Sequence, residues 1–85
     1  MTPHLVRKYT GHAITADAMT AARQHAGALP MLAAALTNTC HALAATEADL
    51  KRGPVVCGMR FNALIAQRSA HISHLRALTR LWLAH

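Results

Sequence analysis

Acidic residues are scarce in this sequence of 85 residues, which contains only Asp17, Glu47 and Asp49. Catalysis by carboxylates needs groups whose environments separate their pKa values, and three scattered acids offer no such pair. The sequence also lacks a glycine-rich phosphate loop and a nucleophile elbow. We therefore expect a protein that is not an enzyme and that needs no cofactor.

Aromatic residues are equally few, with one Phe, one Trp and one Tyr. The core must therefore be built from Leu, Ile, Met and Ala, and Ala has the highest intrinsic helix propensity. The only strand-like signal is the Val55-Val56 pair. These features predict an all-α fold in which residues 1–85 form one domain. A core of this size is marginal, and such chains often gain stability by association.

The two cysteines, Cys40 and Cys57, are too few for a disulfide framework or a zinc pattern. On antiparallel helices that meet near residues 53–54, they would lie about 15 Å apart along the axis, which is beyond disulfide reach. Reduced thiols in the cytoplasm are the simpler expectation. The uncharged stretch 26–46 is mostly Ala and is interrupted by proline and polar residues, so we expect no membrane insertion.

Proline, glycine and charge divide the chain into segments. Residues 1–11 are interpreted as a short basic arm, and a first helix is expected over 12–27 with Thr15 as its N-cap. Further helices are expected over 30–52 and 55–84, because a basic sequence followed by Gly and Pro separates them. The prediction is a long antiparallel helical hairpin with a shorter N-terminal helix against it, similar to a three-helix bundle.

The second predicted helix has a leucine every seven residues, at Leu29, Leu36, Leu43 and Leu50. This spacing is close to that of a coiled coil, and in so short a chain it favours an intramolecular core over a dimer zipper. On the third helix, the expected facing residues are Leu64, Arg68, Ile72 and Leu75.

The third predicted helix has two stripes that could be buried. Its large residues fall within an arc of roughly 140°, and they are Phe61, Leu64, Ile65, Ile72, Leu75, Leu78 and Trp82. Small residues occupy another side, chiefly Ala63, Ala66, Ala70, Ala77 and Ala84, with Ser73 and Leu81 completing the row. Small side chains let a second helix approach closely. We expect this row to bind a helix, either residues 14–26 or a partner protein.

Arg68 interrupts the stripe of large residues and is a candidate partner-binding residue. A charge there is unfavourable unless it is paired or reaches solvent along its stem. The predicted register places Thr39 and Cys40 opposite Arg68, with no carboxylate at that level. An arginine that bonds backbone carbonyls is one reading. The other is an anchor for a carboxylate of a partner, since Arg is well suited to forked recognition.

The chain has a net charge of +6, and no acidic residue follows Asp49. This asymmetry suits an acidic partner or nucleic acid, or it only keeps a hydrophobic bundle in solution. Nucleic-acid binding is the second candidate function, although no aromatic stacking platform or helix-turn-helix spacing accompanies the basic residues. His71 and His74 could share a metal ion, but a site needs three or four ligands and we expect none.

The segment from Leu43 through Leu50-Lys51-Arg52-Gly53, followed by Cys57 and the stripe of Leu64, Leu75 and Leu78, resembles small co-chaperones of bacterial type III secretion systems. The resemblance covers roughly residues 25 to 82 and is carried by motifs that any α-hairpin could contain. It implies a helical hairpin that pairs with a helical chaperone and keeps a needle subunit soluble in the cytoplasm. The sequence therefore predicts a protein-binding module, a chaperone or an assembly subunit, whose partner is another protein or a second copy.

Overall fold

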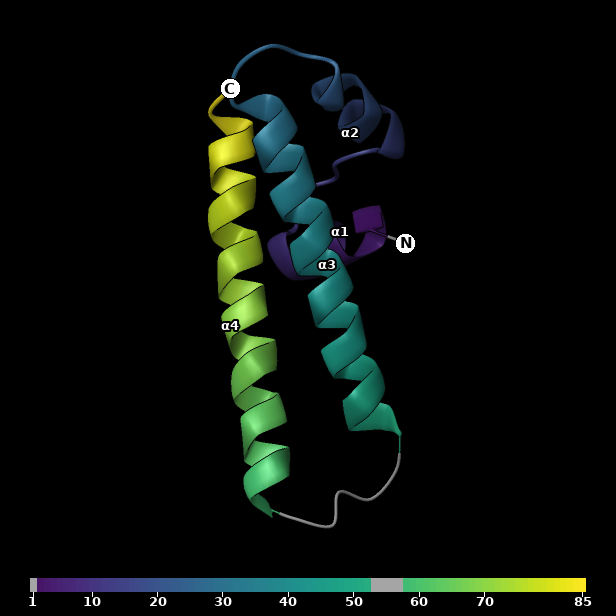
Figure 1. Cartoon of the computed structure of the whole chain (residues 1–85), viewed down its shortest axis with the longest axis vertical. Helices are drawn as coiled ribbons and strands as arrows, with labels where there is room; N and C mark the ends of the chain where they lie inside the picture. The colour runs from purple at the N-terminus through teal and green to yellow at the C-terminus, as the bar shows by residue number, and fades with distance from the viewer. Residues whose placement is uncertain (1, 53–57) are drawn as a thin grey trace.

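The computed structural model describes residues 2–52 and 58–85, and this part of the chain contains four helices and no strand. They are α1 (Thr2–Thr10), α2 (Ala16–Arg23), α3 (Leu29–Lys51) and α4 (Gly58–Leu83). Helices α3 and α4 run antiparallel along their length, α1 crosses behind α3 and contacts both long helices, and α2 lies beside the first turns of α3 (Figure 1). The predicted all-α hairpin is confirmed.

Helix α1 corrects the prediction that residues 1–11 are only a basic arm. Leu5 and Val6 are buried, and Tyr9 packs beside them one turn later, so one side of this segment is apolar at helical spacing. The helix ends before Gly11, which has a φ of 76° and donates from its backbone N–H to the carbonyl of Arg7 at 3.0 Å. The basic residues Arg7 and Lys8 lie on its exposed side.

Helix α2 is shorter than the predicted helix over 12–27. Thr15 is its N-cap as predicted, because its hydroxyl accepts a hydrogen bond from the backbone N–H of Ala18 at 3.0 Å. The cap excludes residues 12–14 from the helix, and Gly27 adopts a φ of 94° in the connection to α3. Met19 and Ala22 face inward and pack with the hairpin core.

The two long helices match their predicted ranges to within three residues at each end, although the predicted register is wrong. Thr39 Oγ1 lies 3.5 Å from Nδ1 of His74, whereas the prediction placed Thr39 opposite Arg68. At the level of Thr39, α4 is therefore displaced by about six residues from the predicted register. The predicted reversal at residues 53–54, Val55-Val56 and Cys57 lie outside the described residues.

The core runs between α3 and α4 and beneath the two short helices. Leu36, Leu43 and Leu75 are completely buried and belong to one hydrophobic cluster, as predicted. Leu5, Val6, Ile14 and Met19 join that cluster from the N-terminal segment. Leu64 is also buried but lies outside the cluster, toward the loop end of the hairpin. Of the seven residues in the predicted stripe on α4, Phe61 and Ile65 are therefore exposed, whereas the other five are buried or partly buried.

Candidate functional site

The row of small residues on α4 is not covered by residues 14–26. Helix α2 packs on α3, and α1 packs on both long helices, so the first of the two expected alternatives is wrong and the second, a partner protein, stays a prediction. Ala63, Ala66 and Ala70 are exposed, and Leu81 retains 54% of its accessible surface. Ala77 is partly exposed. At 100° per residue, Met59 falls in the same row, and we call these six residues the outer row.

A second exposed apolar group lies on α4 near the loop end of the hairpin. Phe61 and Ile65, one turn apart, are 45% and 40% exposed, and Met59 of the outer row is 82% exposed. These side chains are uncovered because α1 contacts α4 from Arg68 toward its C-terminal end. The N-terminal turns of α4, residues 58–67, therefore have apolar side chains in solvent on two sides.

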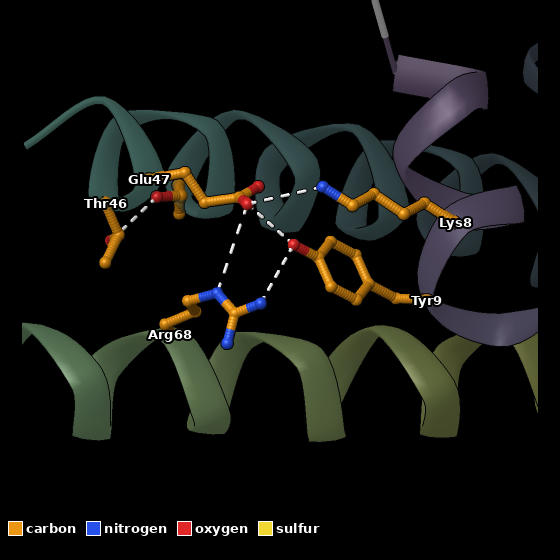
Figure 2. Close-up of polar contacts among 6 residues, drawn as sticks. Lys8, Tyr9, Thr46, Glu47 and Arg68 are labelled. Carbon is orange, nitrogen blue, oxygen red and sulfur yellow. Dashed lines mark hydrogen bonds and ion pairs between the residues drawn. The ribbon is translucent and has the colours of Figure 1, made fainter. Parts of the chain in front are cut away.

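Arg68 lies beside a carboxylate, contrary to the premise on which its anchor role was predicted. Its Nε is 4.0 Å from Oε2 of Glu47, and its Nη2 donates to the hydroxyl of Tyr9 at 3.3 Å (Figure 2). The corrected register brings Glu47 to this level, and α1 supplies Tyr9. The side chain of Arg68 is only 36% exposed. Arg68 is thus an internal link, and its partner-binding role stays a prediction.

Glu47 is the centre of this polar cluster. The hydroxyl of Tyr9 donates to its Oε2 at 2.6 Å, and Nζ of Lys8 lies 3.7 Å from the same oxygen (Figure 2). The Glu47 side chain is 17% exposed, so the carboxylate is partly removed from water while donors from α1 and α4 surround it. Cations also flank the Tyr9 ring, with Lys8 Nζ at 5.1 Å and Arg68 Cζ at 5.5 Å from its centroid. This cluster was not predictable from local sequence patterns, because it depends on where α1 docks.

The cluster binds α1 to the hairpin and offers no reaction chemistry. Its single carboxylate accepts a hydrogen bond from Tyr9 and forms ion pairs with Lys8 and Arg68, and no second acid accompanies it among these residues. Arg76 adds a further link, because its Nε donates to the backbone carbonyl of Tyr9 at 3.0 Å. The arrangement therefore has the character of a structural clamp between α1, α3 and α4.

The cysteine and histidine candidates do not converge. Cys40 is buried, and burial raises the pKa of its thiol, which keeps it protonated at neutral pH. His74 contacts Thr39, and within residues 2–52 and 58–85 no group of three potential metal ligands comes together. In the same ranges, no helix is apolar over a length that could cross a membrane.

Comparison with known proteins provides no family assignment. No protein-family model matches the chain, and no curated protein or solved structure is significantly similar to it. The function is therefore inferred from the fold and from the chemistry of its surface.

Proposed function

We propose that this chain is a protein-binding module of the cytoplasm, a chaperone or assembly subunit comparable to the needle co-chaperones of type III secretion. Its partner would be a helical protein, such as a chaperone or a secretion subunit, or a second copy of the chain. The binding surface would be the exposed side of α4. The supporting observation is the uncovered apolar surface on that helix.

The chemistry of α4 supports a helical partner. The outer row has small side chains at its centre, at Ala63, Ala66 and Ala70, and these allow two helix backbones to approach closely. Met59 and Leu81 lie at its two ends and are exposed, so they could pack around a docked helix. Exposed apolar residues are ordinary when they occur singly, but a contiguous set along one helix is typical of an interaction surface.

The charge of the chain is the observation behind the alternative function, nucleic-acid binding. Two arginines of α4 are already engaged, because Arg68 contacts Glu47 and Tyr9 while Arg76 bonds the Tyr9 carbonyl. Arg60 and Arg80 remain, and they lie about 160° apart around the helix. Phosphate binding weakens steeply with salt through counterion release, whereas an apolar helix interface changes little. Association measured at 50 and 300 mM salt therefore separates the two functions.

Photo-crosslinking in the native cell tests the proposed surface. A photoreactive amino acid at Phe61 or at Ala66 should give a discrete protein adduct that mass spectrometry can identify. The matched control is Gln24, which is exposed at the end of α2 on a different part of the molecule. If Phe61 and Ala66 give no adduct, or the same adducts as Gln24, then α4 is not the binding surface.

A further inference from the structure

A cavity of about 240 Å³ lies where the end of α1 meets the last turns of α4. It is lined by Thr10, His12, Arg76, Thr79 and Arg80. Arg76 and Arg80 are one helical turn apart, so their side chains come from the same side of α4. Gly11, with a φ of 76°, follows the end of α1, and His12 after it also lines the cavity. Two guanidinium groups and an imidazole thus share one opening.

The two hydroxyl groups that line the cavity, those of Thr10 and Thr79, already donate hydrogen bonds to backbone carbonyls. Thr10 Oγ1 donates to the carbonyl of Val6 at 2.6 Å, and Thr79 Oγ1 donates to the carbonyl of Leu75 at 2.8 Å. Arg76 uses its Nε for the Tyr9 carbonyl, which leaves its two terminal amino groups. The donors that remain for a ligand therefore belong to Arg76, Arg80 and the ring of His12. Two of these three groups are permanently positive.

No carboxylate lines this cavity, and neither Arg76 nor Arg80 forms an ion pair in the described part of the chain. Two of the three acidic residues form ion pairs elsewhere. Glu47 pairs with Lys8 and Arg68, and Asp49 pairs with Arg52. The positive charge at this opening is therefore not balanced by an ion pair within the described fold. It is available to an anion from outside.

We propose that this cavity binds a phosphate group, either as a phosphate monoester or as free inorganic phosphate. A phosphate monoester carries a charge of about −1.5 to −2 at pH 7, which matches two guanidinium groups, whereas a single carboxylate would match only one. The volume lies just below the roughly 300–1,000 Å³ of pockets that enclose small molecules, so the site fits an anionic group rather than a whole metabolite. This inference does not depend on the proposed protein-binding function of α4.

Binding at this site would also strengthen the attachment of α1. Arg76 lines the cavity while its Nε bonds the carbonyl of Tyr9 at the end of α1. A phosphate held by Arg76 and Arg80 would fix the Arg76 side chain in the rotamer that makes this bond. Ligand that binds only the folded chain raises the melting temperature by mass action.

The test is a titration of the isotope-labelled full chain with inorganic phosphate at pH 7.5 and constant ionic strength, followed by nuclear magnetic resonance. We expect saturable shifts of the Gly11, His12 and Thr79 amides. Arg80→Gln should weaken binding at least tenfold without loss of helicity, because no hydrogen bond or ion pair holds the Arg80 side chain within the described residues. Arg60→Gln is the matched control, since it removes the same charge from α4 about 30 Å away.

The outcomes separate specific binding from general charge effects. Chemical shifts that do not saturate would overturn the proposal, and so would an equal loss of phosphate affinity in Arg80→Gln and Arg60→Gln. Equal binding of acetate at the same ionic strength would also contradict it, because the site would then be a carboxylate site. A phosphoserine peptide analogue supplies a second arm. Tighter binding than that of inorganic phosphate would support a phosphorylated side chain as the source, and equal binding would support free phosphate.

Discussion

The hydroxyl of Tyr9 donates a 2.6 Å hydrogen bond to the carboxylate of Glu47, 38 residues away in the sequence. This bond joins α1 to the hairpin at the point where Arg68 of α4 approaches from the other side (Figure 2). Three helices therefore meet at one partly buried acid. The same contact explains why a basic N-terminal segment that was expected to be an arm is a docked helix.

Tyr9→Phe should lower the free energy of unfolding by about 1–2 kcal/mol, because a hydrogen bond to a charged acceptor is lost while the ring keeps its packing. Urea denaturation followed by circular dichroism measures this change. The control is Asp49→Asn on the same helix, whose ion pair with Arg52 is exposed and should contribute less than about 1 kcal/mol. Equal effects of the two substitutions would show that the Tyr9–Glu47 contact is not special.

Arg68→Met should reduce stability by about 0.5–1 kcal/mol, since it keeps the apolar stem but leaves Glu47 with Lys8 and Tyr9 alone. If Arg68 is instead an anchor for a carboxylate of a partner, the same change leaves stability intact and removes binding of the partner. Thermal and urea melts distinguish the two expectations. If the stability of Arg68→Met is unchanged and its binding of the partner is lost, then Arg68 is a partner-binding anchor.

Leu43→Ala should destabilise the chain by about 2–4 kcal/mol, because Leu43 is completely buried at the centre of the hairpin. Leu81→Ala is the matched control on an exposed leucine, and we expect less than about 0.5 kcal/mol. Comparable losses of stability for Leu43→Ala and Leu81→Ala would contradict the arrangement of buried and exposed residues described for α3 and α4.

The thiol of Cys40 should resist alkylation in the folded chain, since it is buried and burial raises its pKa. Because folding raises the pKa of this thiol above its unfolded value of about 8.5, the thiol contributes to stability below that pH. The contribution is lost as the pH rises through the pKa of the folded state. Stability should therefore fall above about pH 9 in a Cys57→Ser background, where only Cys40 remains, and fall less when Cys40 is also replaced by Ala. Rapid alkylation of Cys40 at pH 7.5 in the native state would disprove its burial.

Much of the hairpin could be predicted from local sequence, and the reasons are physical. The heptad leucines identified Leu36 and Leu43 as core residues, and Thr15 was recognisable as a cap because capping is a local contact. Helix α1 was not predictable, because a helix of 9 residues is unstable alone and depends on tertiary packing. The Glu47–Arg68 contact also depends on the register between α3 and α4, which the helical periodicity of each segment does not determine.

The cavity at Arg76 and Arg80 was beyond sequence reasoning for the same reason. Both arginines were visible as basic residues of the third helix, but their neighbours Thr10 and His12 come from a segment whose position depends on α1. The outer row on α4, in contrast, was recognised from its 100° spacing. What the sequence left open was whether α2 or a partner covers it, and α2 does not.

Ala70→Arg is the measurement that tests the central claim most directly, because Ala70 is exposed at the middle of the outer row. We expect the melting temperature and helical circular-dichroism signal to stay unchanged. Binding of the partner identified by crosslinking should weaken at least thirtyfold, or about 2 kcal/mol, as charge and bulk enter a close contact. The control Ala21→Arg places the same side chain on the exposed surface of α2 and should leave binding intact. If Ala70→Arg binds the partner as tightly as the unaltered chain does, the outer row is a solvated alanine surface and the proposed interface is wrong.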